Sequence, residues 1–219
     1  MTIDIETLPT ESTEVITKIG STIKPPANYK KQETIDQWMT ENYEIELKNR
    51  VSKTALDGAY GKIACIAWSI DDEIHTTLQI DNETDVIISL YEYISSITNV
   101  DLAFCGHYIS SFDLPFLLQR SIILGIKPPQ AILRAMRAKS WDDCIRDTHL
   151  MWTGDRNKHI GLGTLCWILG VDHGSPDFEG SMVADTWADD PQKVIDYCAH
   201  DVKATVEIYN KLTFGEAVF

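Results

Sequence analysis

The sequence lacks a long apolar run, a secretory leader and a cysteine pattern typical of metal binding. No segment stays apolar over the about 20 residues that a membrane helix requires. Residues 1–6 contain neither a basic region nor an apolar stretch. We therefore expect no membrane partner and, by default, a cytoplasmic location. No two of the five cysteines are spaced C-x-x-C, which disfavours a zinc site, and we interpret them as reduced core residues.

Positive charge is also scarce and unevenly distributed. The net charge is −14, and residues 63–119 contain nine acidic residues but no Lys or Arg. Such a total argues against a nucleic-acid partner. However, residues 120–158 contain eight bases against four acids, and residues 24–62 contain seven against six. The middle of the chain therefore offers either a modest phosphate-binding surface or an ordinary solvated face, and bound divalent cations would offset the acidic total locally.

Strand and helix patterns alternate along the 219 residues, a length that suggests one domain with room for an insertion. Apolar runs bounded by turn residues predict strands, and apolar residues at helical spacing predict helices. The elements predicted in this way are a strand over 2–6, a strand over 61–71 with a hairpin partner over 74–80, a helix over 84–97, a strand over 101–106, and helices over 111–124 and 190–212. This alternation predicts an α/β fold with a mixed sheet.

Residues 9–60 interrupt this order, because a connection of that length is too long for a simple loop. Residues 34–37 fit a capping box, and apolar residues then recur at every fourth position, at Ile35, Met39, Tyr43, Leu47 and Val51. We interpret this segment as a helical insertion that decorates the sheet, and not as a second domain.

Three separated acidic motifs are the candidate functional residues. Asp4 and Glu6 are two apart on a strand, so both project from one face, where two carboxylates repel each other unless a cation lies between them. Asp113 falls in the first turn of a predicted helix, where the helix dipole alone would favour an acid. Tyr197 and Asp201 are four apart on the last helix and face the same way. An acid on that largely apolar face is costly to bury without a partner.

In this order the motifs resemble the DEDD exonuclease superfamily, and the tyrosine four residues before the last aspartate resembles its DEDDy branch. More narrowly, the chain resembles stand-alone predicted exonucleases related to the exonuclease domain of family B DNA polymerases. The resemblance covers nearly the whole chain, and its supporting segments are 23–31, 55–63, 146–148, 161–165 and 179–183. It implies a ribonuclease H-like mixed β-sheet flanked by helices, with the helical insertion after the first strand. It also makes residues 1–219 a single 3′–5′ exonuclease domain.

The resemblance further implies phosphodiester hydrolysis with two divalent metal ions, Mg²⁺ or Mn²⁺, which hard oxygen ligands favour. Asp4 would bridge both ions, and Glu6 and Asp201 would hold the ion that activates water. Asp113 would support the second ion, through water. Tyr197 would orient the attacking water through its hydroxyl group, which need not ionise.

The implied substrate is a nucleic acid with a free 3′ end, with single-stranded DNA favoured over RNA. Thr7 and Leu8 directly follow the first motif and are expected to contact the terminal nucleotide, although packing alone would also explain Leu8. Lys24, Lys30 and Lys31 are candidate phosphate contacts.

The chain departs from the DEDD pattern at Tyr108, which stands five residues before Asp113, where the family usually carries Asn. This departure bears on substrate positioning and not on metal binding, and Tyr108 is itself a candidate substrate contact. A DEDDh enzyme would carry His five residues before Asp201, but Asp196 stands there.

Two alternatives stay open. The first is a 3′–5′ exoribonuclease, because the motifs do not distinguish DNA from RNA. The second is an inactive nucleic-acid-binding or polymerase-accessory module that kept the fold, although the retention of all four carboxylates and the tyrosine weighs against it. A replication or repair partner is compatible with each of these functions, and the sequence does not give the oligomeric state.

Overall fold

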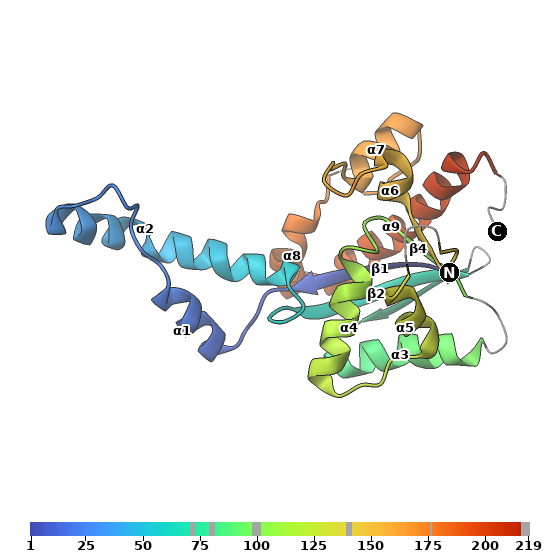
Figure 1. Ribbon diagram of the computed structural model, residues 1–219, viewed down its shortest axis with the longest axis horizontal. Coiled ribbons are helices and arrows are strands. Elements are labelled where there is room, and N and C mark those ends of the chain that lie inside the picture. The colour runs from blue at the N-terminus through green and yellow to red at the C-terminus, as the bar shows by residue number, and fades with distance from the viewer. Residues whose placement is uncertain (71–72, 79–81, 98–101, 139–141, 176, 216–219) are drawn as a thin grey trace.

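A five-stranded mixed sheet forms the centre of the molecule (Figure 1). The computed structural model describes residues 1–70, 73–78, 82–97, 102–138, 142–175 and 177–215. In spatial order the strands are β3 (Glu73–Leu78), β2 (Lys62–Ile70), β1 (Thr2–Leu8), β4 (Phe104–Gly106) and β5 (Ile145–Asp147). β1, β2 and β3 pair antiparallel, whereas β4 runs parallel to β1 and β5 parallel to β4. The predicted mixed sheet is therefore confirmed, and the strand that carries the first acidic motif is its central strand.

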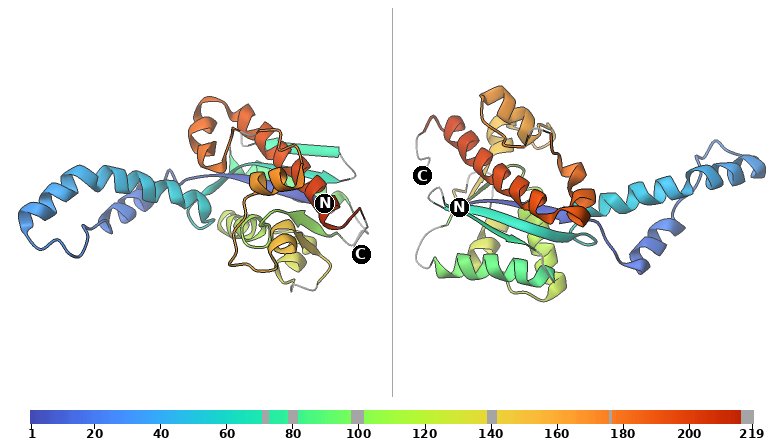
Figure 2. Two further views of the ribbon diagram at one scale, coloured as in Figure 1. Left: turned by 90° about the horizontal axis from the view of Figure 1, so that it is seen from above. Right: turned by 180° about the vertical axis from the view of Figure 1, so that it is seen from behind.

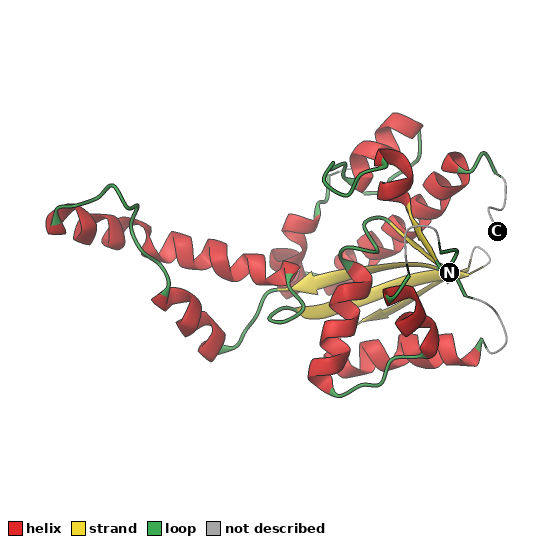
Figure 3. Ribbon diagram, viewed as in Figure 1, coloured by secondary structure: helices red, strands yellow, loops and turns green. Residues whose placement is uncertain are grey.

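Helices cover both faces of this sheet, as Figures 2 and 3 show. On one face lie α3 (Glu83–Ser96), α4 (Asp113–Leu124) and α5 (Gln130–Met136), and on the other lie α8 (Val183–Asp189) and α9 (Pro191–Leu212). The short helices α6 (Thr148–Thr153) and α7 (Leu162–Leu169) connect β5 to this second layer, followed by the 3-10 turn η2 (Gly180–Met182).

Side-chain alternation along β1 divides the molecule into two cores. Ile3 and Ile5 pack with the α3–α4–α5 layer, whereas Leu8 packs with α8 and α9. Because successive strand residues point to opposite faces, the even-numbered Asp4 and Glu6 project toward the α9 layer. A third core, between α7 and α9, includes Leu165, Cys166, Ala204 and Ile208. All five cysteines are free thiols and four of them are buried.

The predicted helix ends are confirmed where local capping signals exist. The Asp190 carboxylate accepts a hydrogen bond from the Lys193 N–H and Pro191 opens α9, while Gly125 ends α4 with a φ of 70°. The helix predicted from residue 111 begins at Asp113 instead, because residues 108–112 form a turn whose N–H groups bond to other acceptors. Residues 71, 79, 80 and 101 of the predicted strands lie outside the described residues.

The insertion forms an arm that projects from the end of β1 (Figures 1 and 2). It consists of α1 (Thr13–Ser21), α2 (Gln32–Ser52) and the 3-10 turn η1 (Lys53–Leu56). At its base the Thr10 N–H donates to Thr54 Oγ1 at 2.8 Å. The α2 helix packs against α1 and has no buried residue. The helical insertion is thus confirmed, but it extends away from the sheet and does not decorate it.

The predicted capping box in this arm was wrong. Helix α2 begins at Gln32 after Lys31, which makes no side-chain capping bond, so Thr34 lies inside the helix. The Gln32 side chain instead donates to Asp36 at 2.8 Å, one turn along. No helix among the described residues combines the length and the apolar character needed to span a bilayer.

A buried ion pair joins the layer of α3 and α4 to the sheet. Arg120 Nη2 lies 2.7 Å from Glu83 Oε2, with the two side chains 12% and 7% exposed. Glu83 Oε1 also accepts the N–H of Ile63 in β2 at 2.7 Å, and Arg120 donates to the Gly58 carbonyl at 3.2 Å. The pair therefore fixes both helices relative to β2 and to the base of the arm.

We predict that Arg120→Met lowers the free energy of unfolding by about 3 kcal/mol, because the Glu83 carboxylate would stay buried without its cation. Urea unfolding measures this change. Arg137→Met, which alters an exposed arginine at the end of α5, is the matched control and should change stability by less than about 0.5 kcal/mol. Equal effects of the two substitutions would contradict the assigned role of the pair.

Candidate metal centre

Strand β1 and helix α9 together bring three carboxylates into one cluster. Asp4, Glu6 and Asp201 each offer an oxygen atom, and these atoms all lie within 4.8 Å of one another. Glu6 is 8% and Asp201 6% exposed, and Asp4 is half-buried. Asp4 and Asp201 are 197 positions apart in the sequence. They meet because α9 crosses the face of β1 to which the side chains of Asp4 and Glu6 point.

Cys198 fixes the contact between these two elements. Its thiol donates to the Asp4 carbonyl at 3.5 Å and to Asp4 Oδ2 at 3.3 Å. Burial raises the pKa of Cys198 well above its ordinary value, so the sulfur keeps the proton that it donates. Asp201 follows Cys198 by three residues, and helical spacing places it on the same side of α9. The sequence marked Cys198 only as a core residue.

Asp113 lies beside the three clustered carboxylates. Its Oδ1 accepts the N–H of Ile5, between the two β1 acids, at 3.2 Å. This bond forms because β4 pairs with β1 at Thr2 and ends at Gly106, so no further strand residue satisfies that N–H. Asp113 is 3% exposed.

Burial and the neighbouring carboxylates raise the pKa of Asp4, Glu6 and Asp113. Burial is the largest cause for Asp4, followed by the charges of Asp113 and Asp201, and together they raise its pKa well above the ordinary value. Burial and then the charge of Asp4 do the same to the pKa of Glu6. Burial raises the pKa of Asp113 to about 7. Among the described residues, no Lys or Arg forms an ion pair with any of the four, and His173 pairs with Asp201.

Tyr197 stands one helical turn before Asp201 and borders the same cluster. Its side chain is 9% exposed. Burial, followed by the charges of Asp201 and Glu6, raises the pKa of Tyr197 above its ordinary value. The hydroxyl group therefore stays protonated at neutral pH and can donate a hydrogen bond into the cluster.

The donor set fits a pair of hard divalent cations. Carboxylate oxygens are the ligands that Mg²⁺ and Mn²⁺ prefer. Asp201 Oδ1 is buried, yet it accepts no hydrogen bond from the described residues, and a buried polar atom without a partner is rare in folded proteins. A bound cation would satisfy this oxygen and offset the mutual repulsion of the acids.

His173 also reaches the cluster, and no local sequence pattern marked it as a site residue. Its Nε2 lies 3.2 Å from Asp201 Oδ1, although the geometry does not form a hydrogen bond. Contact with Asp201 is the main cause that raises the pKa of His173. The residue comes from the segment between α7 and η2, which only the tertiary fold places against α9.

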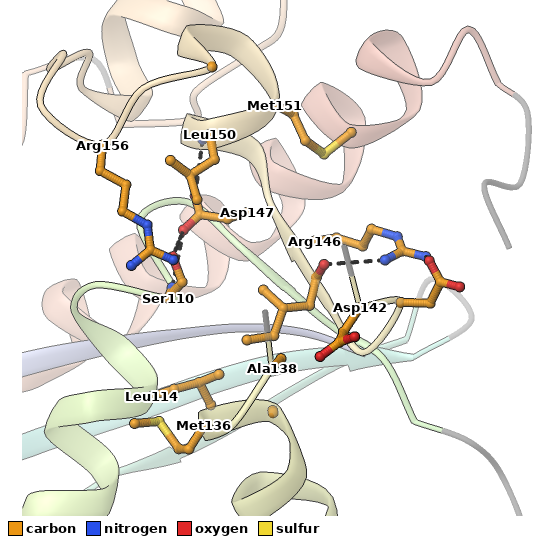
Figure 4. Close-up of a pocket in the computed structure, with 14 residues that line it drawn as sticks. Ser110, Leu114, Met136, Ala138, Asp142, Arg146, Asp147, Leu150, Met151 and Arg156 are labelled. Atoms are coloured by element: carbon orange, nitrogen blue, oxygen red, sulfur yellow. Dashed lines mark hydrogen bonds and ion pairs between the residues drawn. The ribbon is translucent and has the colours of Figure 1, made fainter. Parts of the chain in front are cut away.

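Asp147 organises the turn that leads into Asp113. Its carboxylate accepts the N–H groups of Tyr108 and Ser110, each at 3.1 Å, and the Ser110 hydroxyl (Figure 4). It also accepts from the first N–H groups of α6. One buried acid therefore ties the 108–112 turn to the end of β5, and this explains the presence of Asp147 without a catalytic role.

Tyr108 has a backbone φ of 66°, in the left-handed region. Asn is several-fold enriched in that region among residues other than Gly, which gives a backbone reason for the Asn that the DEDD pattern usually carries here. In this chain the Tyr108 ring packs against His149, with ring centres 3.9 Å apart and ring planes tilted by 31°. Its contact with substrate stays a prediction.

The other two expected substrate contacts are already engaged within the fold. Thr7 donates its hydroxyl to the Ala55 carbonyl at 2.6 Å, and Leu8 is 5% exposed in the core beneath α8 and α9. Substrate binding by these two residues also stays a prediction.

Comparison with known proteins gives the family. Residues 61–218 match a family described as a predicted 3′–5′ exonuclease related to the exonuclease domain of PolB. The chain belongs to this family. The matched range contains Asp113, Tyr197 and Asp201 but begins after Asp4 and Glu6, so the first two acids are linked to it through the fold alone. No curated protein matches the sequence.

The fold is shared with a solved DNA polymerase. The chain is similar to the family B DNA polymerase from the hyperthermophilic archaeon Pyrobaculum calidifontis, with a TM-score of 0.60 and 16% identity. The match covers 96% of this chain and 24% of the polymerase chain. This similarity confirms the expected fold, a ribonuclease H-like mixed sheet flanked by helices, which the chain shares with about a quarter of the larger protein.

We predict that Mn²⁺ raises the Tm of the protein, by about 5 °C or more at saturating concentration, because it binds only the folded cluster. Asp4→Asn should remove this increase. It should also raise the metal-free Tm by a few degrees, because it removes one charge from the repelling group while keeping an acceptor for Cys198.

Differential scanning calorimetry with and without Mn²⁺ measures both effects. Asp189→Asn, at an exposed position on α8, is the control and should behave as the parent protein does. A metal-dependent increase that survives in Asp4→Asn would refute the metal centre.

Proposed function

We propose that residues 1–219 act as one exonuclease domain that removes nucleotides from the 3′ end of DNA, single-stranded in preference, with two divalent metal ions. The observation that carries this proposal is the convergence of the Asp4, Glu6 and Asp201 oxygens within 4.8 Å. Family membership supports it, because the matched family is one of predicted 3′–5′ exonucleases.

The cations supply the charge that phosphodiester hydrolysis requires. Bound in pairs about 3.5–4 Å apart, Mg²⁺ or Mn²⁺ ions stabilise both the attacking and the leaving oxygen of an in-line displacement. Asp4, Glu6 and Asp201 would hold them with their clustered oxygens. Asp113, with one oxygen bound to the Ile5 N–H, would act through its second oxygen and water.

The chain's own groups would position the nucleophile. Tyr197 keeps its proton at neutral pH, so its hydroxyl can hold the attacking water by a hydrogen bond without acting as a base. The Cys198 contact with Asp4 keeps α9 against β1, and this keeps Tyr197 and Asp201 in place relative to the first motif. A change of about 1 Å in such positions costs on the order of 100-fold in rate.

An exoribonuclease is the second candidate, because the cluster acts on the phosphodiester group that DNA and RNA share. A non-catalytic module is disfavoured, since a binding protein would have no use for a buried carboxylate cluster that no Lys or Arg among the described residues pairs with. The polymerase similarity makes a replication or repair partner part of the same proposal.

We predict that the protein shortens a 5′-labelled single-stranded oligonucleotide stepwise from its 3′ end, and only when Mg²⁺ or Mn²⁺ is present. Asp4→Asn and Asp201→Asn should each reduce the rate by at least about 100-fold, and Tyr197→Phe by about ten- to 100-fold. Gel analysis of the ladder measures this, with matched DNA and RNA substrates compared side by side.

The Tyr197→Phe variant should keep the metal-dependent increase in Tm, since it removes no ligand. Identical purification of the Asp4→Asn protein controls for contaminating nucleases. Shortening from the 5′ end, or full activity in Asp4→Asn, would contradict the proposal.

We also predict that the arm contributes phosphate contacts. Residues 15–32 contain four lysines and no acid, and Lys24, Lys30 and Lys31 are exposed. Replacing these three by Gln should lower the salt dependence of single-strand binding, with a slope of log K against log salt smaller by about 2. The exposed Lys127 and Lys211, replaced together, are the control. An unchanged slope would show that the arm does not contact phosphates.

A further inference from the structure

An exposed tryptophan lines a groove that lies next to the candidate metal centre. Helix α7 uses Leu165 and Cys166 to pack against α9, which leaves Trp167 83% exposed. Single exposed apolar residues are normal on protein surfaces. Trp167 differs from such residues because it lines a groove of about 720 Å³, which His173 and Tyr197 also line.

The groove adjoins the carboxylate cluster through His173 and Tyr197. His173 Nε2 lies 3.2 Å from Asp201 Oδ1, and Tyr197 precedes Asp201 by one helical turn on α9. A strand whose terminal phosphodiester lies at the cluster would therefore place an adjacent part of itself in this groove.

The walls favour a flat, uncharged group over a phosphate. None of the described residues that line the groove is Lys or Arg, whereas Asp172 and Glu179 are among them. The two acids would repel a phosphate, since Lys193 lies over the Phe178 ring, 5.3 Å from its centre, but is not among the residues that line the groove. Phe178 and Tyr197 form an aromatic wall with ring centres 4.7 Å apart, and Trp167 provides an indole face.

Two of the glycines that line the groove border open space. Gly161 and Gly180 line it, and a Cβ atom added at either position would meet nothing within 4 Å. The space next to these two glycines is therefore open. The shape and chemistry match a nucleobase, which binds by stacking on aromatic rings whatever its identity.

We propose that Trp167 stacks a nucleobase of the strand that is shortened and so helps to hold its 3′ end at the cluster. The inference rests on the proposed function for its choice of ligand. Trp167 touches the substrate and none of the candidate metal ligands, so it contributes to binding and not to the chemical step.

The test measures binding to the Asp4→Asn protein, which cannot cleave, by fluorescence anisotropy. Two oligonucleotides are compared that differ only in the last residue, which is either a normal nucleotide or an abasic one. The parent should bind the normal end about tenfold more tightly, the difference that one stacked base contributes. Trp167→Ala should abolish this preference, and Trp167→Phe should keep most of it.

Trp152→Ala is the matched control. Trp152 is 42% exposed on α6 and does not line the groove, so its removal should leave the preference unchanged. In the active protein, Trp167→Ala should raise KM with little change in kcat.

A preference that persists in Trp167→Ala would overturn the inference, as would the absence of oligonucleotide binding by the Asp4→Asn protein. If Trp167→Ala weakened binding to a protein partner and left oligonucleotide binding unchanged, Trp167 would belong to a protein interface. That result would also overturn the inference. These failures are separate from failure of the proposed function, which is judged by metal-dependent shortening of 3′ ends in the unaltered protein.

Discussion

The repulsion among buried carboxylates at the crossing of β1 and α9 is the constraint on which the structure depends. Two strand residues that share a face, Asp4 and Glu6, meet Asp201 from the last helix, and Asp113 is held beside them by the backbone of β1. Burial denies these groups the solvation that would stabilise their charges. The fold tolerates this cost because two apolar cores, one on each face of the sheet, hold the elements together.

The surrounding architecture serves to keep this crossing in place. Cys198 donates to Asp4 across the two elements, and Asp147 holds the turn from which Asp113 enters α4. The Glu83–Arg120 pair fixes the opposite layer. The residues with clear structural roles therefore surround the cluster, whereas Asp201 Oδ1 accepts no hydrogen bond from the described residues and lies 3.2 Å from His173 Nε2. Such a contrast is typical of a site built for a ligand.

Strong local signals explain which parts of this fold could be predicted from the sequence. Alternation on β1, the Asp190–Pro191 start of α9 and the Gly125 end of α4 each act within a few residues, and each was confirmed. The short helices α5 to α8 and strand β5 were not predicted, because elements of three to eight residues take their form from tertiary contacts. The arm illustrates the same limit. Its residue spacing predicted a helix, but spacing does not reveal whether that helix packs on the sheet or projects from it.

The same distinction applies to the candidate site. Asp4, Glu6 and Asp201 share faces that strand and helix periodicity define, so their directions followed from the sequence. The roles of Cys198 and His173 depend on which elements meet, and Leu8 proved to be part of the core because the sheet face that carries the acids also supports α8 and α9. The φ of 66° at Tyr108 follows from hydrogen bonds to Asp147, a residue 39 positions away.

The most direct measurement is the anomalous diffraction of Mn²⁺ in crystals of the protein soaked with that ion. The account predicts two peaks among the oxygens of Asp4, Glu6 and Asp201, with the second on the Asp113 side, at the separation of about 3.5–4 Å that two-metal nucleases share. Ordered water or a lysine side chain at that position, with no Mn²⁺ peak among the four carboxylates, would contradict it.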